Sequence, residues 1–109
     1  MNISEKKNNG FCILYIEGII DSEKVHDFEK AVIGVIDRGE NHLIVNCKEL
    51  KYISSIGLRV FLIAQKRIIA VKGKMYLCEF RPAVLQTVVI SGFSSIFRIF
   101  ETEDEALQA

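Results

Sequence analysis

One stretch of the chain organises the rest: Tyr52-Ile53-Ser54-Ser55-Ile56-Gly57-Leu58-Arg59-Val60-Phe61-Leu62. Small polar residues there give way abruptly to a long apolar segment with helical spacing, which is typical of the start of a helix. Ser54 and Ser55 are both suitable N-cap residues, because a serine oxygen can accept a hydrogen bond from the free amides of the first turn. A phosphate at the same place would meet those amides and the positive end of the helix dipole. The serine pair therefore has two interpretations, a plain helix cap or a functional hydroxyl.

The segment before this helix predicts a hairpin, a helix and a buried strand. Asn8-Asn9-Gly10 is a turn signal followed by strand-forming residues, and Gly18 should end that second strand. An amphipathic helix follows, capped by Asp21 or Ser22 and ended by Gly39. The next run is short, β-branched and almost continuously apolar, as expected of a strand in the middle of a sheet. In order, these elements are a short strand before residue 8, the strand 11–16, the helix between residues 22 and 39, the strand 42–47 and a loop over 48–53.

The segment after the central helix alternates strand and helix. Gly73 should end the central helix, Pro82 should open the next one, and Ser91-Gly92 should close it. The intervening strands are expected at 74–80 and 96–100, and the acidic end predicts a short helix or a frayed tail. This order predicts an α/β fold with a mixed, mainly parallel sheet of about four to five strands, an N-terminal hairpin and helices packed against the sheet.

The central helix carries apolar residues on two opposite sides. Helical spacing places one set of apolar residues on the side expected to face the core: Leu58, Phe61, Leu62, Ile68 and Ile69. The second strip, with Arg59 and Arg67 among or beside it, is Ile56, Val60, Ile63, Ala64 and Val71. A helix on a sheet at the edge of a domain buries one face, so this second strip is predicted to be exposed and to bind a partner. The alternative is that another element covers it.

Composition and charge indicate one folded domain, residues 1–109, with half of its residues hydrophobic. The chain has 14 basic and 14 acidic residues, so no net field points to nucleic acid or to an anionic membrane. From Lys48 to Lys74, however, basic residues strongly outnumber acidic ones, and the C-terminal residues are acidic. A solvated surface is the expected reading of both regions, and a charged docking face is the alternative.

The cysteines and the N-terminal residues bear on the compartment. Cys12, Cys47 and Cys78 are odd in number and lack metal-binding spacing, so we expect reduced core cysteines without a zinc site or a disulfide framework. The first residues are too polar for a signal peptide, and the apolar run Val60–Ala64 is too short to span a membrane. The sequence predicts a cytoplasmic protein without a metal or cofactor.

No recognised catalytic motif is present, whether of a serine hydrolase, a zinc protease, a phosphate loop or a dinucleotide site. His26 and His42 have no triad or ligand partner at a recognisable spacing, so surface or cap roles are expected for both. Asp21 should lie at the same edge of the sheet as Ser54 and Ser55, where sites of open α/β sheets gather, although it can equally serve as an N-cap. These patterns favour a binding protein over an enzyme.

Three ordered motifs resemble the STAS domain of bacterial anti-sigma factor antagonists. The segment Leu50–Leu62 resembles the family signature, and Gly18-Ile19-Ile20-Asp21 resembles its G-x-x-D at the end of a strand. The segment from Pro82-Ala83-Val84 to Ser91-Gly92-Phe93 resembles its late helix. The resemblance runs from about Phe11 to Phe100, nearly the whole chain.

The resemblance implies a non-enzymatic regulator of sigma-factor-dependent transcription that works by partner switching. Its partners would be an anti-sigma factor that is also a serine kinase and a serine phosphatase, and the protein would be a monomer or weak dimer. The acceptor serine of the family lies two residues before the glycine, which corresponds to Ser55, with Ser54 as the alternative. The expected partner-binding residues are Asp21, Ser54, Ile56, Gly57, Arg59, Val60, Ile63 and Arg67.

Two other functions remain open at this point. The first is a STAS scaffold subunit of a sensory or lipid-transport complex that is never phosphorylated. The second is a small hydrolase that uses Ser55, which would require a general base and an oxyanion site.

Overall fold

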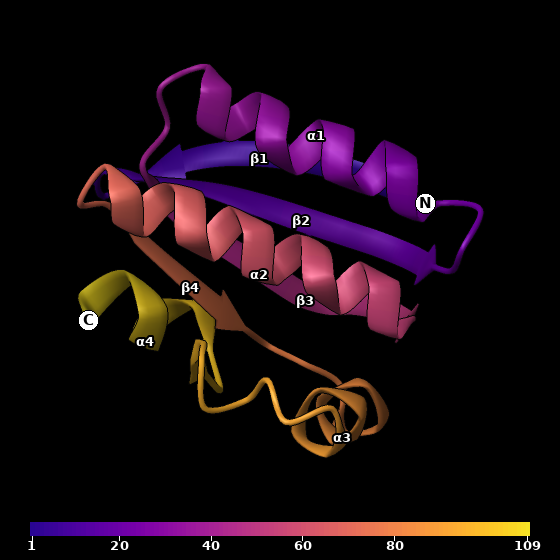
Figure 1. Cartoon of the computed structure of the whole chain (residues 1–109). Coiled ribbons are helices and arrows are strands. Elements are labelled where there is room, and N and C mark those ends of the chain that lie inside the picture. Colours follow the sequence, from indigo (N-terminus) through magenta and orange to yellow (C-terminus); the bar gives the residue numbers. More distant parts are fainter.

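Five strands form one mixed sheet in the order β1-β2-β3-β4-β5 in the computed structural model, which describes all residues, 1–109 (Figure 1). The strands are β1 (Asn2–Asn8), β2 (Phe11–Ile20), β3 (His42–Ile53), β4 (Lys74–Cys78) and β5 (Arg98–Phe100). β1 runs antiparallel to β2, and the other pairs are parallel. The turn between β1 and β2 uses Asn9 and Gly10, both at positive φ. The predicted mainly parallel sheet with an N-terminal hairpin is therefore confirmed.

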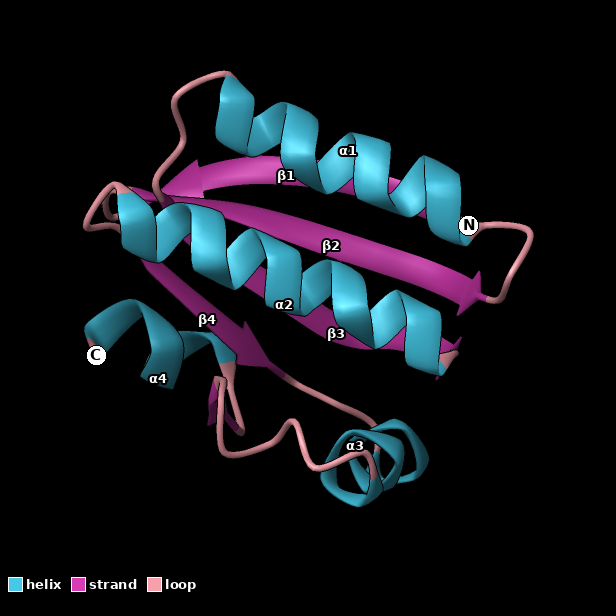
Figure 2. Ribbon diagram, viewed as in Figure 1, coloured by secondary structure: helices cyan, strands magenta, loops and turns pink.

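Four helices cover the two faces of this sheet unequally (Figure 2). They are α1 (Val25–Asp37), α2 (Ser55–Ala70), α3 (Pro82–Ile90) and α4 (Glu103–Gln108). α1 and α2 lie side by side, and residues of α1, α2 and α3 share the large core on one face. Ala106 of α4 belongs to a small separate core on the opposite face.

The aromatic centre of the large core lies under α2. The ring of Phe61 meets Phe28 of α1 edge-on at 5.4 Å between centroids, and it meets Phe97 before β5 at 6.2 Å. Phe61 and Phe28 are completely buried. The side chain of Phe61 thus joins α1, α2 and the C-terminal part of the chain into one packed layer.

β2 and β3 are longer than predicted. β2 continues through Gly18 to Ile20, and the predicted loop 48–53 is the second half of β3. Tyr15 pairs with Asn46 but Glu17 pairs with Glu49, so β3 gains one residue, and a second irregularity follows at Gly18. Such β-bulges break the alternation of buried and exposed side chains that identifies a strand. The loop prediction was wrong for this reason.

The predicted division of α2 into two apolar faces was partly wrong. Val60 and Ala64, which were expected on the outside, are 2% and 0% exposed, whereas Ile69, expected inside, is 60% exposed. Ile56 and Ile63 are exposed as expected. α1 packs beside α2, which accounts for the burial of Val60. α3 lies near the end where α2 begins (Figure 1), away from the C-terminal end of α2 that carries Ile69.

The ends of the other elements agree with the predictions except at three places. The N-cap residue of α1 is Lys24, and Asp21 instead accepts hydrogen bonds from the amides of Glu23 and Lys24 in the preceding turn. β4 stops at Cys78 because Glu79 has a φ of 60°, which takes the backbone out of strand geometry. β5 is shorter than predicted by two residues at its start. Pro82 opens α3 as predicted, and the acidic tail forms α4 with a complete capping box.

The three cysteines are buried and free. Burial raises the pKa of the thiol in each of them, and for Cys78 burial together with the nearby Glu79 and Glu103 raises the pKa to about 12. A thiol with a raised pKa is a poor nucleophile at neutral pH, because the thiolate is the reactive form. These residues therefore act as core side chains.

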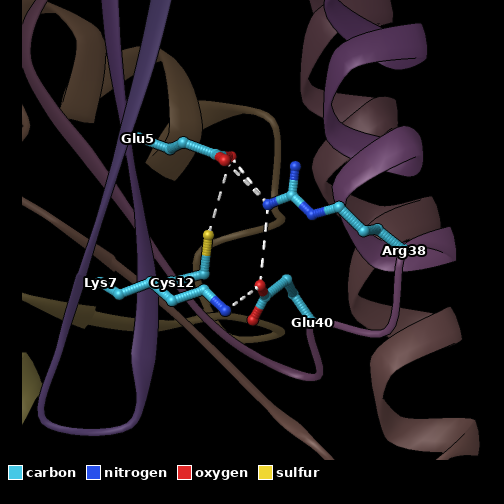
Figure 3. A network of polar contacts seen from close by, with 5 residues as sticks. All are labelled: Glu5, Lys7, Cys12, Arg38 and Glu40. Atoms are coloured by element: carbon cyan, nitrogen blue, oxygen red, sulfur yellow. Dashed lines mark hydrogen bonds and ion pairs between the residues drawn. The ribbon is translucent and has the colours of Figure 1, made fainter.

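A charged network ties β1 to the end of α1 (Figure 3). Both oxygens of Glu5 accept hydrogen bonds from Arg38, at 2.9 and 3.0 Å, and Lys7 pairs with Glu40 at 2.6 Å. Arg38 also lies 3.7 Å from Glu40. The hydrogen bond from Lys7 lowers the pKa of the Glu40 carboxyl, with Arg38 adding to the effect. β1 is the edge strand, so these contacts hold it against the helix layer.

Glu40→Gln is expected to reduce the pH dependence of stability in acid. Because the pKa of Glu40 is lowered on folding, its contribution is complete above the ordinary glutamate value of about 4.3 and is lost as the pH falls through the lower folded value. Urea unfolding between about pH 3 and pH 6 should show the gap to the wild type shrinking as the pH falls. Glu101→Gln, at an exposed acid outside the ion pairs, is the control and should leave the slope unchanged. A gap for Glu40→Gln that is independent of pH would contradict this expectation.

Candidate functional site

Ser54 forms the N-cap of α2 and connects it to the sheet. Its Oγ accepts a hydrogen bond from the Gly57 amide at 3.1 Å, and its carbonyl accepts one from the Leu58 amide at 3.0 Å. Its own amide donates to the Ile20 carbonyl, at the end of β2, at 2.9 Å. Ser54 therefore caps the first turn of α2, as expected of an N-cap serine, and its amide also connects the helix start to β2.

Ser55 is the first residue of α2, and unlike Ser54 its side chain does not cap the helix. Its side chain is exposed, and its hydroxyl takes part in no hydrogen bond within the chain. The residue that caps the helix and the residue whose hydroxyl is free are thus two adjacent serines. The structure resolves which of them is the cap, a choice that the sequence left open.

The ends of β2 and β3 bring Asp21 to the serine pair. Ile20 pairs with Ile53 in the last register position of the two strands, and the next residues are Asp21 and Ser54. The turn that follows Asp21 is held by its own carboxylate, whose Oδ1 accepts two amide hydrogen bonds at 3.1 Å. The sequence-based expectation that Asp21 and the serines share one edge of the sheet agrees with this geometry.

Gly57 is required where α2 crosses the ends of these strands. A Cβ at Gly57 would lie 2.7 Å from Cγ1 of Ile53 and 3.0 Å from Cγ2 of Ile20. Gly57 is buried, and so is Val60. Both were expected to contact a partner, but their side-chain positions face the interior, so they can only position the surface residues around them.

Three large, partly exposed side chains lie close to the serine pair along the chain or at the ends of β2 and β3. Ile56 is 50% exposed, Tyr52 is 51% exposed and Ile19 is 43% exposed. Ile19 and Tyr52 are paired neighbours on β2 and β3. We call the set Ile19, Asp21, Tyr52, Ser55 and Ile56 the entry surface of α2. Tyr52 was missed, because the second half of β3 was predicted to be a loop; its signal was a bulky side chain next to the buried strand end at Ile53.

The exposed side of α2 continues this surface along the helix. Arg59 and Ile63 are exposed, and Arg67 is exposed but pairs with Asp37 of α1 at 3.2 Å. α2 contains three basic residues and no acid. This side of the helix therefore combines apolar and cationic groups, a composition common in protein-binding surfaces.

The Ser55 hydroxyl has no catalytic partner among the contacts of the structure. No hydrogen bond joins Ser55 to His26, to His42 or to a carboxylate, and His42 begins β3 at the opposite end of the sheet. Nucleophilic catalysis needs a base within hydrogen-bond reach of the nucleophile. The described contacts therefore provide a modifiable hydroxyl and an apolar surface but no base for Ser55.

A hollow of about 560 Å³ lies elsewhere, on the sheet face that carries α4. Its lining is mainly polar and acidic, and includes Tyr15, Asn46 and Glu103. Asn46 donates to Glu103 at 3.0 Å, and burial together with Glu103 raises the pKa of Tyr15 to about 12. No three His, Cys, Asp or Glu side chains are grouped so as to hold a metal ion. None of the helices has the length and apolar character needed to cross a membrane.

Comparison with known proteins identifies close relatives in sequence. A protein of Bordetella bronchiseptica provisionally named the anti-sigma factor antagonist BtrV is 34% identical over 109 residues, covering 100% of this chain and 94% of that protein. The anti-sigma F factor antagonist of Paenibacillus polymyxa is 27% identical, over 98% of this chain and 92% of its own.

Solved structures agree with this result at the level of the fold. The anti-sigma factor antagonist SpoIIAA in its unphosphorylated form superposes with a TM-score of 0.80 at 21% identity, covering 98% of this chain and 94% of that chain. The phosphorylated form of the Bacillus protein SpoIIAA superposes with a TM-score of 0.71 at 20% identity, covering 98% and 97%. The sequence profile of the STAS domain matches residues 2–106. The chain therefore belongs to the STAS domain family.

Proposed function

We propose that this protein is an anti-sigma factor antagonist that binds an anti-sigma factor through the entry surface and the outer side of α2. The anti-sigma factor is proposed to be a serine kinase that transfers the γ-phosphoryl group of ATP to the Ser55 oxygen, releasing ADP and the hydroxyl proton. A serine phosphatase would restore the free hydroxyl by hydrolysis. The names of the sequence relatives support this function.

The observation that carries the proposal is the free, exposed hydroxyl of Ser55 beside a capped helix start. Phosphorylation of Ser54 would convert the hydroxyl that caps the Gly57 amide into a bulkier phosphate ester and rearrange the cap, whereas phosphorylation of Ser55 leaves that hydrogen bond in place. Ser55 is therefore the acceptor that a kinase can modify without breaking the cap. Ser54 contributes to the same surface by holding the helix start in position.

The proposed docking surface contains the exposed members of the expected set. These are Ile56, Arg59, Ile63 and Arg67, to which the half-buried Asp21 and the strand-end residues Ile19 and Tyr52 are added. Exposed apolar side chains with cationic neighbours suit a partner that presents apolar and acidic groups. A phosphate on Ser55 adds nearly two negative charges in the middle of this surface. It would repel acidic groups of the partner and hinder burial of Ile56, so the complex would dissociate.

Paired serine variants test the assignment of the acceptor. With ATP and the anti-sigma-type serine kinases of the source organism, the wild type and Ser54→Ala should be phosphorylated, and Ser55→Ala should not, as read by mass spectrometry of the intact protein and its peptides. Ser54→Ala should lose about 1 kcal/mol of unfolding free energy with the cap, while Ser55→Ala should lose almost none. Modification of Ser55→Ala at another serine would refute the site.

Binding measurements separate this function from a scaffold role. The unmodified protein should bind the kinase, and Ser55→Asp, which carries part of the phosphate charge, should bind it at least tenfold more weakly, an effect on the order of 1.4 kcal/mol. Ser95→Asp, at another exposed serine, is the control and should bind normally. Equal binding by Ser55→Asp and Ser55→Ala, with stable co-purification of other subunits, would instead favour the scaffold.

A further inference from the structure

Arg59 is an unpaired cation on the outer side of α2. The ion pairs of the protein use Lys7, Arg38, Arg67 and Arg81 as their basic partners, and Arg59 takes part in no ion pair or hydrogen bond. α2 contains no acidic residue that could pair with it. Its guanidinium is exposed and therefore free to bind an anion.

The neighbours of Arg59 on the helix surface leave one candidate partner. Residues three and four positions away are Ser55, Ile56, Leu62 and Ile63, and only Ser55 carries a polar group. Side chains of a helix lean toward its N-terminus, so the long side chain of Arg59 extends back over the turn that contains Ser55. Positions i and i+4 have Cβ atoms about 5–6 Å apart, well within the reach of a guanidinium to a phosphate.

We infer that Arg59 binds the phosphate of Ser55 within the same chain, an inference that rests on the proposed function because it requires that modification. A guanidinium offers paired N–H donors that match two phosphate oxygens. In the unmodified protein the same side chain has no such acceptor within its helix and is available to an acidic group of the partner. Phosphorylation therefore changes the docking surface in two ways. It adds a dianion at Ser55, and it makes the Arg59 guanidinium unavailable to the partner.

Phosphorus NMR of the protein with phosphoserine incorporated at position 55 tests this contact without any partner. A nearby cation stabilises the dianion, so Arg59→Gln should raise the second pKa of the phosphate by a few tenths of a unit. Arg59→Lys keeps the charge but loses the paired donors, so its phosphate pKa should lie close to that of the parent protein. Lys66→Gln, on the same exposed side of α2 but farther along it, is the matched control and should leave the titration unchanged. The charged residues on the adjoining elements are the same in every variant, so their effect on the phosphate pKa cancels in the comparison. They are Asp21, Glu23, Lys24 and Lys51.

The possible outcomes separate the two ideas. If Arg59→Gln and Lys66→Gln give the same phosphate pKa as the parent, the internal contact does not form and the inference is overturned. In that case loss of kinase binding by the phosphoserine protein would still support the proposed function. If instead the phosphate responds to Arg59 but the phosphoserine protein binds the kinase as well as the unmodified one, the contact exists and the proposed switch is wrong.

Discussion

Phe61→Ala is expected to lower the free energy of unfolding by about 3–5 kcal/mol, the largest effect of any substitution considered for this protein. Phe61 is completely buried and contacts Phe28 and Phe97 edge-on, so truncation removes a large apolar side chain and two aromatic contacts together. The cavity would lie between α1, α2 and the segment before β5, elements that are far apart in the sequence. The surrounding backbone is fixed by the sheet and can close the cavity only in part.

Urea unfolding followed by circular dichroism measures this loss. Ile63→Ala is the matched control, because Ile63 lies on the exposed side of the same helix and its truncation should cost far less. Phe61→Leu should recover part of the stability, since it fills part of the same volume. Equal losses for Phe61→Ala and Ile63→Ala would mean that the core does not lie where the structure has it.

Gly57→Ala is expected to destabilise the protein by about 1–3 kcal/mol, although alanine is the better helix former. The added Cβ would lie 2.7 Å from Ile53 and 3.0 Å from Ile20, so α2 must move away from the strand ends that hold the entry surface. Movement at this place also shifts Ser55, so phosphorylation should slow in the same variant. The effect links the packing of the helix start to the proposed switch.

Gly34→Ala is the control for this substitution, because Gly34 also lies within a helix but has no atom within 4 Å of an added Cβ. It should stabilise the protein by about 0.5–1 kcal/mol through helix propensity alone. Unfolding curves of the two variants should therefore shift in opposite directions. A stabilising effect of Gly57→Ala would show that the helix start can accommodate a Cβ at this position, which would contradict the structure.

Local patterns in the sequence predicted most of the candidate site. Ser54 and Ser55 were recognised as helix-start residues because small hydroxyl side chains precede an apolar helical run, and the structure makes Ser54 the cap. Asp21 was expected at the same sheet edge from the order of strands alone, and the pairing of Ile20 with Ile53 agrees. These predictions succeeded because turns, caps and strand order depend on neighbouring residues.

Predictions that depended on contacts between distant segments were less successful. Val60 was assigned to the outer strip of the central helix, but α1 packs against that flank and buries it. The second half of β3 was read as a loop, because its bulges against β2 disturb the alternation of side chains. Tyr52 was overlooked for the same reason. Helical periodicity gives the angle of each side chain around one helix, but it cannot tell which neighbour covers each side.

The sequence by itself determined the family resemblance, the order of elements and the presence of two serines at the start of the central helix. These features are encoded locally, in the apolar spacing and in the residues that begin and end each element. Only the tertiary structure decided which serine is the cap, which apolar residues of α2 remain exposed and that Arg59 has no partner. The exposure along α2 and the lack of a partner for Arg59 depend on which segments far apart in the chain pack against the helix. The choice of cap depends on the backbone conformation, which places Ser54 in the extended region before the first turn, and either serine of the pair could have filled that position.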